Sequence, residues 1–175
     1  MAFVFDATIG GANSNSYPTV EYADDYFDGM LYRTEWPARG STGADLLKKQ
    51  QALVVGTRDL ERLTFAGTRA SYSGQRLQFP RANLTDRDGF YISSTVMPTE
   101  ILDACCEQAL FRLQQNPDNL VDESLKQFKR LKILNVLDME MRDGTPTENT
   151  ICERAMELIS RWLLVSNGTT RLVRA

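Results

Sequence analysis

The fold is decided by the stretch Met97-Pro98-Thr99-Glu100-Ile101-Leu102-Asp103-Ala104-Cys105-Cys106-Glu107-Gln108-Ala109-Leu110, residues 97–110 of the chain. Pro98 suits the first turn of a helix, and Glu100 favours the positive end of the helix dipole. Apolar or small residues then recur at helical spacing on a broad stripe, which comprises Ile101, Leu102, Cys105, Ala109, Leu110 and Leu113. The stripe predicts a helix that is buried in a bundle and ends at Asn116-Pro117.

Three further helices are predicted around this one. Thr19 has the residue type of an N-cap, and the helix that follows carries an apolar face of Val20, Ala23, Phe27 and Met30. Tyr22 and Tyr26 are four residues apart, so we expect them to stack along one flank. A second helix is predicted over 44–63, with Lys48, Lys49, Arg58 and Arg62 on a solvated face. A last helix is predicted over 147–165, where Thr150 and Glu153 are spaced for a capping box.

In the stretch 131–141 the spacing of apolar residues changes from the helical repeat to an alternating one. Apolar residues alternate with other residues there, which favours a strand, although Leu, Lys and Met also favour helices and both interpretations stay open. Residues 65–96 are rich in Gly, Ser, Asp and Arg and predict a long loop, a class of segment that is usually functional or disordered. Asp86-Arg87-Asp88-Gly89 predicts a tight turn within it.

These patterns predict a mainly α fold: a small bundle of about four helices with a short β-hairpin or strand element and long extended loops and termini. The length of 175 residues suits one domain. We expect residues 1–175 to form that domain, with 1–15 as an N-terminal arm and 168–175 as a C-terminal docking tail.

Composition excludes several function classes. The chain has no histidine, the commonest general base near neutral pH and a common metal ligand, so we expect no catalytic residue, no metal and no cofactor. The three cysteines, an odd count, fit small core residues in a reducing compartment. Neither a membrane span nor a signal peptide is visible, so we expect no membrane partner. The net charge of −3 argues against tight phosphate binding by the whole surface, although a local basic patch remains possible.

Two segments are candidates for binding partners. In the 65–96 loop, Arg69, Arg76, Arg81 and Arg87 interleave with Tyr72 and Phe79, a weak form of the pattern seen in stacking platforms for single strands. At the C-terminus, Arg171-Leu172-Val173-Arg174-Ala175 follows Asn167-Gly168-Thr169-Thr170 and has the apolar and basic residues of a docking strand. The alternative for that tail is a frayed end. Trp36, beside Pro37, is expected to face a partner, whereas Trp162 is expected in the core.

Several motifs, taken in order, resemble those of the head–tail adaptor proteins of tailed bacteriophages, a group often labelled DnaT-like single-stranded DNA-binding protein. Asn15-Ser16-Tyr17 and the helix from Val20 to Phe27 are similar to the opening of that family, and Gln78-Phe79-Pro80-Arg81 is similar to its Trp-Pro-Arg motif. The helix that begins at Pro98 and the Arg171–Ala175 ending are also similar. Phe79 departs from the family, because it stands where a Trp is usual.

The resemblance implies a structural protein without catalytic residues. Copies would form a ring, usually of twelve subunits, at the head–tail junction of a virion, after synthesis in the host cytoplasm. Arg171, Leu172, Val173 and Arg174 would dock on the portal protein, while Trp36, Tyr72, Phe79 and Arg81 would contact neighbouring subunits or the next tail or nozzle protein. Double-stranded DNA would pass through the lumen without sequence-specific binding. The alternative is a replication-type protein that binds single-stranded DNA.

Overall fold

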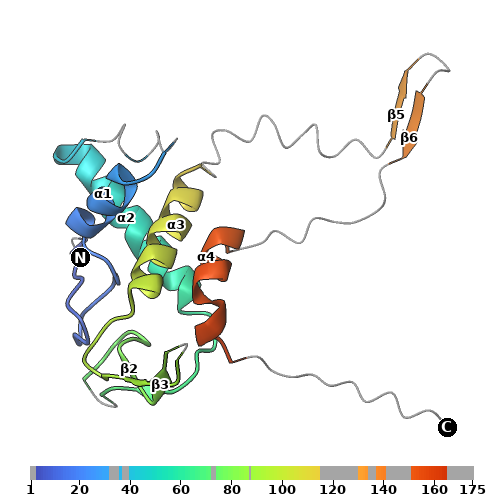
Figure 1. Cartoon of the computed structure of the whole chain (residues 1–175). Helices are drawn as coiled ribbons and strands as arrows, with labels where there is room; N and C mark the ends of the chain where they lie inside the picture. Colours follow the sequence, from blue (N-terminus) through green and yellow to red (C-terminus); the bar gives the residue numbers. More distant parts are fainter. Residues whose placement is uncertain are drawn as a thin grey trace, which may run out of the picture.

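The computed structural model describes residues 3–31, 36, 40–71, 74–86, 88–114 and 151–164, together with the backbone of 130–133 and 137–140. Within these residues the chain forms four α-helices and three two-stranded antiparallel sheets. The helices are α1 (Val20–Asp28), α2 (Gly43–Leu60), α3 (Thr99–Gln114) and α4 (Glu153–Ile159), which continues into the short 3-10 helix η2 (Ser160–Trp162). They pack side by side, and the small strands of the 65–92 segment lie at one end of the bundle (Figure 1). The prediction of about four helices is confirmed, and the described residues form a helix-rich fold that also contains short strand pairs.

Helix α3 lies at the centre of the bundle, as its wide stripe predicted. It packs against α2, α4 and α1. Its small residues allow a close approach: the Cα position of Gly56 on α2 is so near α3 that a Cβ there would lie 3.0 Å from the carbonyl oxygen of Cys105. Cys105 and Cys106 are fully buried free thiols, which confirms the prediction of core cysteines for these two. Small side chains therefore set the distance between the two longest helices.

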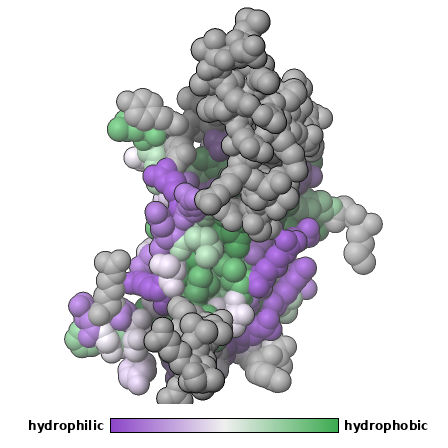
Figure 2. Space-filling view, turned by 90° about the vertical axis from the view of Figure 1, so that its right-hand side faces the viewer, coloured by the Kyte–Doolittle hydropathy of each residue, from purple (hydrophilic) through white to green (hydrophobic). Residues whose placement is uncertain are grey.

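The core has two parts that share α3. One part joins α1, α2 and α3 around Phe27, Leu53 and Trp36. The other joins the C-terminal end of α2, the 65–84 loop, α3 and α4 around Phe65, Phe79 and Trp162. On the face of the molecule that carries α4, hydrophobic side chains gather near the middle and hydrophilic ones flank them (Figure 2).

Helix α1 begins as predicted, since the Thr19 side chain accepts a hydrogen bond from the backbone N–H of Tyr22. The expected stacking of Tyr22 and Tyr26 is wrong. Both hydroxyls instead reach across to α3, where Tyr22 donates to Asp103 Oδ1 at 2.6 Å and Tyr26 donates to Glu107 Oε1 at 3.1 Å. The i, i+4 spacing is the same on both helices, so the two hydrogen bonds fix the register of α1 on α3.

The N-terminal arm is docked on the bundle over its described part. Asn15 makes this possible, because its Oδ1 accepts from the backbone N–H of Asp6 at 3.0 Å and its Nδ2 donates to the carbonyl of Val4 at 2.6 Å. Ser16 is buried and donates to the carbonyl of Pro18. Tyr17 is joined to α2, because the backbone N–H of Tyr17 donates a hydrogen bond to Oγ1 of Thr57. The Asn-Ser-Tyr motif thus closes the arm and joins it to α2.

The bounds of the last helix and the placement of Lys49 differ from the prediction. Helix α4 begins at Glu153, and the atom that caps it is Sγ of Cys152, which accepts from the backbone N–H of Ala155, so the predicted capping box at Thr150 is wrong. Lys49 does not lie on a solvated face. It is buried, and its Nζ lies 2.7 Å from Asp24 Oδ1. Helix α4 ends at Ile159 and continues only as η2 to Trp162, so the predicted end at 165 is wrong. The predicted end of α3 at Asn116-Pro117 lies outside the described residues.

The alternating stretch near residue 131 forms a hairpin of strands β5 (Arg130–Ile133) and β6 (Leu137–Glu140), paired from Arg130↔Glu140 to Ile133↔Leu137. The strand interpretation is therefore confirmed over the helical one. The two other sheets lie in the 65–96 segment, where β1 (Thr68–Arg69) pairs with β2 (Arg81–Ala82) and β3 (Leu84–Thr85) pairs with β4 (Tyr91–Ile92).

Candidate nucleic-acid interface

The segment predicted as a long loop is a compact platform held by buried polar side chains. Arg81 organises it: Nε donates to the carbonyl of Ala66 at 2.6 Å, and Nη2 donates to the carbonyls of Phe65 at 3.0 Å and Gly67 at 2.7 Å. Gln78 adds hydrogen bonds from its Nε2 to the carbonyls of Glu61 and Leu63. A guanidinium has five donors in a fixed fork, so a single side chain can satisfy several carbonyls at once.

Phe79 and Pro80, which precede Arg81, seal the platform against the helices. The Phe79 ring is buried and packs edge-on against Phe65, with ring centroids 4.9 Å apart, and against Tyr17 at 6.1 Å. Gly67 allows the chain before β1 to lie close to β2. Its φ of +74° favours glycine, and a Cβ there would lie only 2.4 Å from the carbonyl oxygen of Ala82.

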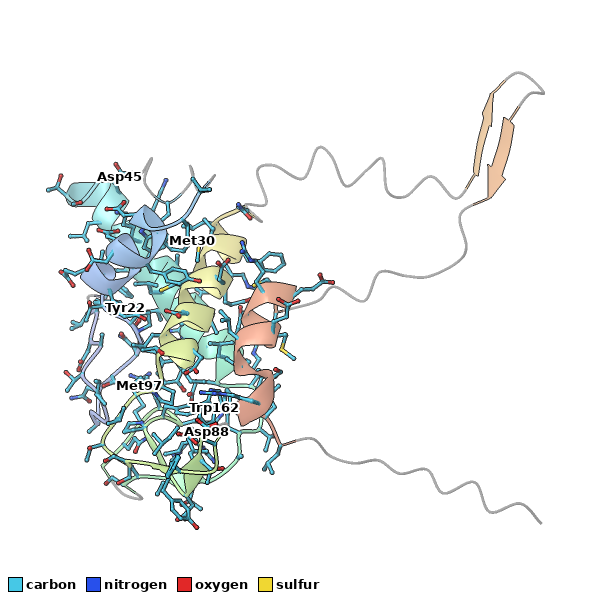
Figure 3. All side chains as sticks on the ribbon, viewed as in Figure 1. Tyr22, Met30, Asp45, Asp88, Met97 and Trp162 are labelled. Atoms are coloured by element: carbon cyan, nitrogen blue, oxygen red, sulfur yellow. The ribbon has the colours of Figure 1, made fainter. Side chains whose placement is uncertain are left out.

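A rigid hairpin projects from this platform. Residues Arg81 to Thr85 run as β2 and β3, interrupted at Asn83 by a φ of +60°. The turn before β4 is closed by Asp86, whose Oδ1 accepts hydrogen bonds from the backbone N–H groups of Asp88 and Phe90, both at 2.9 Å. Gly89 supplies the positive φ that the turn needs. Asp88 in this turn lies at the opposite end of the molecule from Asp45 of α2 (Figure 3). The predicted turn at 86–89 is confirmed for its described residues.

The hairpin exposes two neighbouring aromatic side chains. Phe90 is 71% exposed and Tyr91 is 81% exposed, the two most exposed aromatic residues among those that the structure describes. Sequence reasoning missed them, although the signal was present: an aromatic pair directly after a tight turn lies at a hairpin tip, beyond the reach of the core. Such side chains offer planar faces on which nucleic-acid bases can stack.

The segment is also locally basic. Residues 64–97 contain four arginines and two aspartates in a chain whose net charge is −3, although one of the arginines, Arg81, is buried and bonds backbone carbonyls. Arg69 on β1 and Arg76 are exposed, and Arg76 additionally donates from Nη1 to the carbonyl of Asn13 at 3.3 Å. Proteins that bind single strands combine cations, which meet the phosphates, with aromatic rings, which meet the bases, and this segment exposes both kinds of side chain.

Of the residues predicted to contact neighbouring subunits or a tail protein, the three that the structure describes, Trp36, Phe79 and Arg81, are buried. Trp36 is 1% exposed, its Nε1 donates to Asp24 Oδ1 at 2.7 Å, and Lys49 Nζ lies 5.5 Å from its ring centroid. Phe79 and Arg81 are internal parts of the platform. Contacts between these three residues and a partner stay a prediction, and they would require the side chains to leave the core. Tyr72 and Arg171, Leu172, Val173 and Arg174 lie outside the described residues.

Apart from the platform, a concavity with a volume of about 390 Å³ lies between α1, α3 and α4. Its charged groups interact across it: Arg161 binds Glu100, and Arg154 Nη1 lies 3.9 Å from Glu107 Oε1. The arrangement is that of an interhelical ion-pair network. Within the described part of the chain no group of three metal-ligating side chains is present. No helix there has the length and apolar composition that a membrane span needs.

Comparison with known proteins gives one match. The model of the family described as "Putative DnaT-like ssDNA binding protein" matches residues 1–175. No curated protein and no solved structure gives a match.

Proposed function

The chain belongs to the DnaT-like ssDNA-binding protein family, and we propose that it binds single-stranded DNA through the hairpin β3–β4. The observation that carries the proposal is the exposure of Phe90 and Tyr91 at the end of a hairpin that hydrogen bonds hold rigid. Exposed aromatic side chains cost solubility, and a stacking role explains why two consecutive residues expose their rings to water. Arg69 and Arg76 supply the positive charge for the phosphates.

The charge of the chain predicts how this binding behaves. Outside residues 64–97 the chain carries more acidic than basic residues, so phosphates are attracted to one region only. Each phosphate contact with a single strand contributes about 0.7 to the slope of log affinity against log salt. With Arg69 and Arg76 as the main contacts, we expect a shallow slope of about −1 to −2 and weak binding at physiological salt.

Fluorescence anisotropy with a labelled oligo(dT) tests the proposal across a salt series. Removing both rings with Phe90→Ala and Tyr91→Ala should weaken binding by 10-fold or more, since stacking contributes about 1–3 kcal/mol per base, with the salt slope unchanged. Removing Arg69 and Arg76 should instead flatten the slope. Phe3→Ala, which truncates an exposed aromatic residue in the N-terminal segment, is the matched control and should bind as wild type. Lack of binding even at low salt would contradict the proposal.

A second candidate is a structural role: a ring at the head–tail junction of a phage, beneath the portal, through which DNA passes. The acidic excess outside the platform favours it, because a lumen with few basic groups lets a polyanion slide. In this role Arg171–Arg174 would dock on the portal, and neighbouring copies and the next tail protein would be further partners. Native mass spectrometry of the chain with and without portal tests this candidate. A ring that forms on the portal, together with no oligonucleotide affinity, would favour it over single-strand binding.

A further inference from the structure

The two aromatic rings of the hairpin lie on opposite faces of it. Leu84 pairs with Ile92, and Thr85 pairs with Tyr91. The next pair outward is Asp86 with Phe90, which are joined by a hydrogen bond from the Asp86 N–H to the Phe90 carbonyl at 2.9 Å. Side chains alternate between the faces of a strand, so Phe90 shares the face of Ile92 while Tyr91 lies on the other face. The tip therefore carries one ring on each side, and the side of Phe90 is the one on which the inner residues Leu84 and Ile92 pack against the core.

This separation limits how a single strand can use both rings. The backbone of the hairpin lies between side chains on its two faces, so the two rings cannot share one stack of bases. Successive bases in a stacked strand are separated by about 3.4 Å. Neighbouring bases of one stacked strand therefore cannot cover both rings. Two strands that diverge at the tip can each place a base on one face.

The turn sequence Asp86-Arg87-Asp88 has a net charge of −1, which disfavours the remaining alternative, a single strand that wraps around the turn. Such a strand would carry its phosphates across Asp86 and the exposed Asp88. Both Asp86 hydrogen bonds run through Oδ1 to backbone N–H groups. At the end of a duplex, by contrast, the hairpin tip meets the bases of the terminal base pair. The phosphates lie at the outer edges of the duplex, away from the acidic turn.

We propose that the preferred ligand of the hairpin is a fork, the junction at which duplex DNA separates into two single strands. The tip faces the terminal base pair, Phe90 stacks on a base of one strand, and Tyr91 stacks on a base of the other. Arg69 and Arg76, which are exposed on the same segment of the chain, would meet the phosphates of the separated arms. This inference rests on the proposed single-strand binding and deepens it by naming the ligand.

Three labelled ligands of matched length test the inference at one salt concentration: a fork with two non-complementary arms, a single strand and a blunt duplex. We expect the fork to bind about 10-fold more tightly than either of the others. Phe90→Ala and Tyr91→Ala, each alone, should remove that preference, because a tip with one ring holds only one strand. A 2-aminopurine base placed next to the junction should change its fluorescence on binding to wild type and change less with either variant. Thermal melts verify that the variants are folded.

Two controls sharpen the outcome. Phe3→Ala should keep the fork preference. Asp88→Asn should raise the affinity for the single strand by a few fold, because it removes a negative charge that opposes wrapping of the strand around the turn. The difference in affinity between the fork and the single strand should therefore become smaller. Equal affinity for the fork and the single strand, with loss of both in the ring variants, would overturn the fork inference and leave single-strand binding intact. Absence of binding to all three ligands would overturn both.

Discussion

Replacing Arg81 with methionine tests whether one side chain holds the platform together. In the native protein this guanidinium lies within 3.0 Å of three consecutive backbone carbonyls, those of Phe65, Ala66 and Gly67. Methionine keeps much of the apolar stem and fills similar space, but it donates no hydrogen bond. The substitution therefore isolates the polar role of Arg81 from its packing role.

The size of the effect follows from these contacts. A buried carbonyl left without a donor costs about 1–3 kcal/mol. Three such carbonyls would give a larger sum, but removal of the buried cation also relieves its desolvation cost, and water can reach part of the segment. We expect a loss of about 3 kcal/mol in the free energy of unfolding. Arg81→Lys keeps the charge but cannot bond three carbonyls in one plane, so it should lose about 1–2 kcal/mol.

Urea unfolding followed by tryptophan fluorescence measures the loss directly. Arg69→Met is the matched control, since Arg69 is the cross-strand partner of Arg81 and is exposed, and it should change stability by less than about 0.5 kcal/mol. If Arg81→Met is as stable as Arg69→Met, the carbonyl contacts contribute nothing and the argument fails. The position would then be free to serve a partner, as the sequence had suggested.

Trp36→Ala should cost about 3–5 kcal/mol, as for a core tryptophan, and a thermal melt close to that of wild type would instead return Trp36 to the surface. Gly67→Ala should destabilise clearly more than Gly89→Ala, because both have positive φ but only the Cβ at position 67 collides with backbone; equal denaturation midpoints would contradict this. Burial raises the pKa of the Cys105 thiol to about 12, so a thiol reagent at pH 8 should label it only after unfolding, and fast labelling of the native protein would show an open core. Burial and the nearby Glu61 raise the pKa of Tyr17 well above 10, the value expected in the unfolded chain. Because the unfolded state then loses its proton first, this stability contribution is complete below pH 10 and falls as the pH rises above 10, which an absorbance titration alongside unfolding curves can follow.

Much of the bundle could be predicted because its signals are local. Thr19 caps α1 as predicted, and the stripe of α3 is buried as predicted, since helical periodicity and capping depend on residues close in sequence. The strands near residue 131 could likewise be predicted, because apolar residues alternate along the chain there. The start of α4 was not, because the cap is a cysteine, a residue type that carries no capping signal.

The platform shows where sequence reasoning stops. The motif Gln78-Phe79-Pro80-Arg81 was visible, but an arginine and an aromatic residue in a polar loop have the same appearance whether they face solvent or carbonyls. Arg81 is internal because the carbonyls of residues 65–67 come to it from 14 to 16 positions away. Trp36 is internal for the same kind of reason, since Asp24 and Lys49 converge on it from two helices.

The sequence alone therefore determined the helices, the turn at 86–89 and the lack of histidine chemistry, because each depends on residue type and spacing. Only the tertiary structure decided which polar and aromatic residues are buried and which are exposed. It moved the candidate binding surface from Phe79 and Arg81 to Phe90 and Tyr91. The physical reason is that burial depends on contacts between segments distant in the chain, and no local pattern records them.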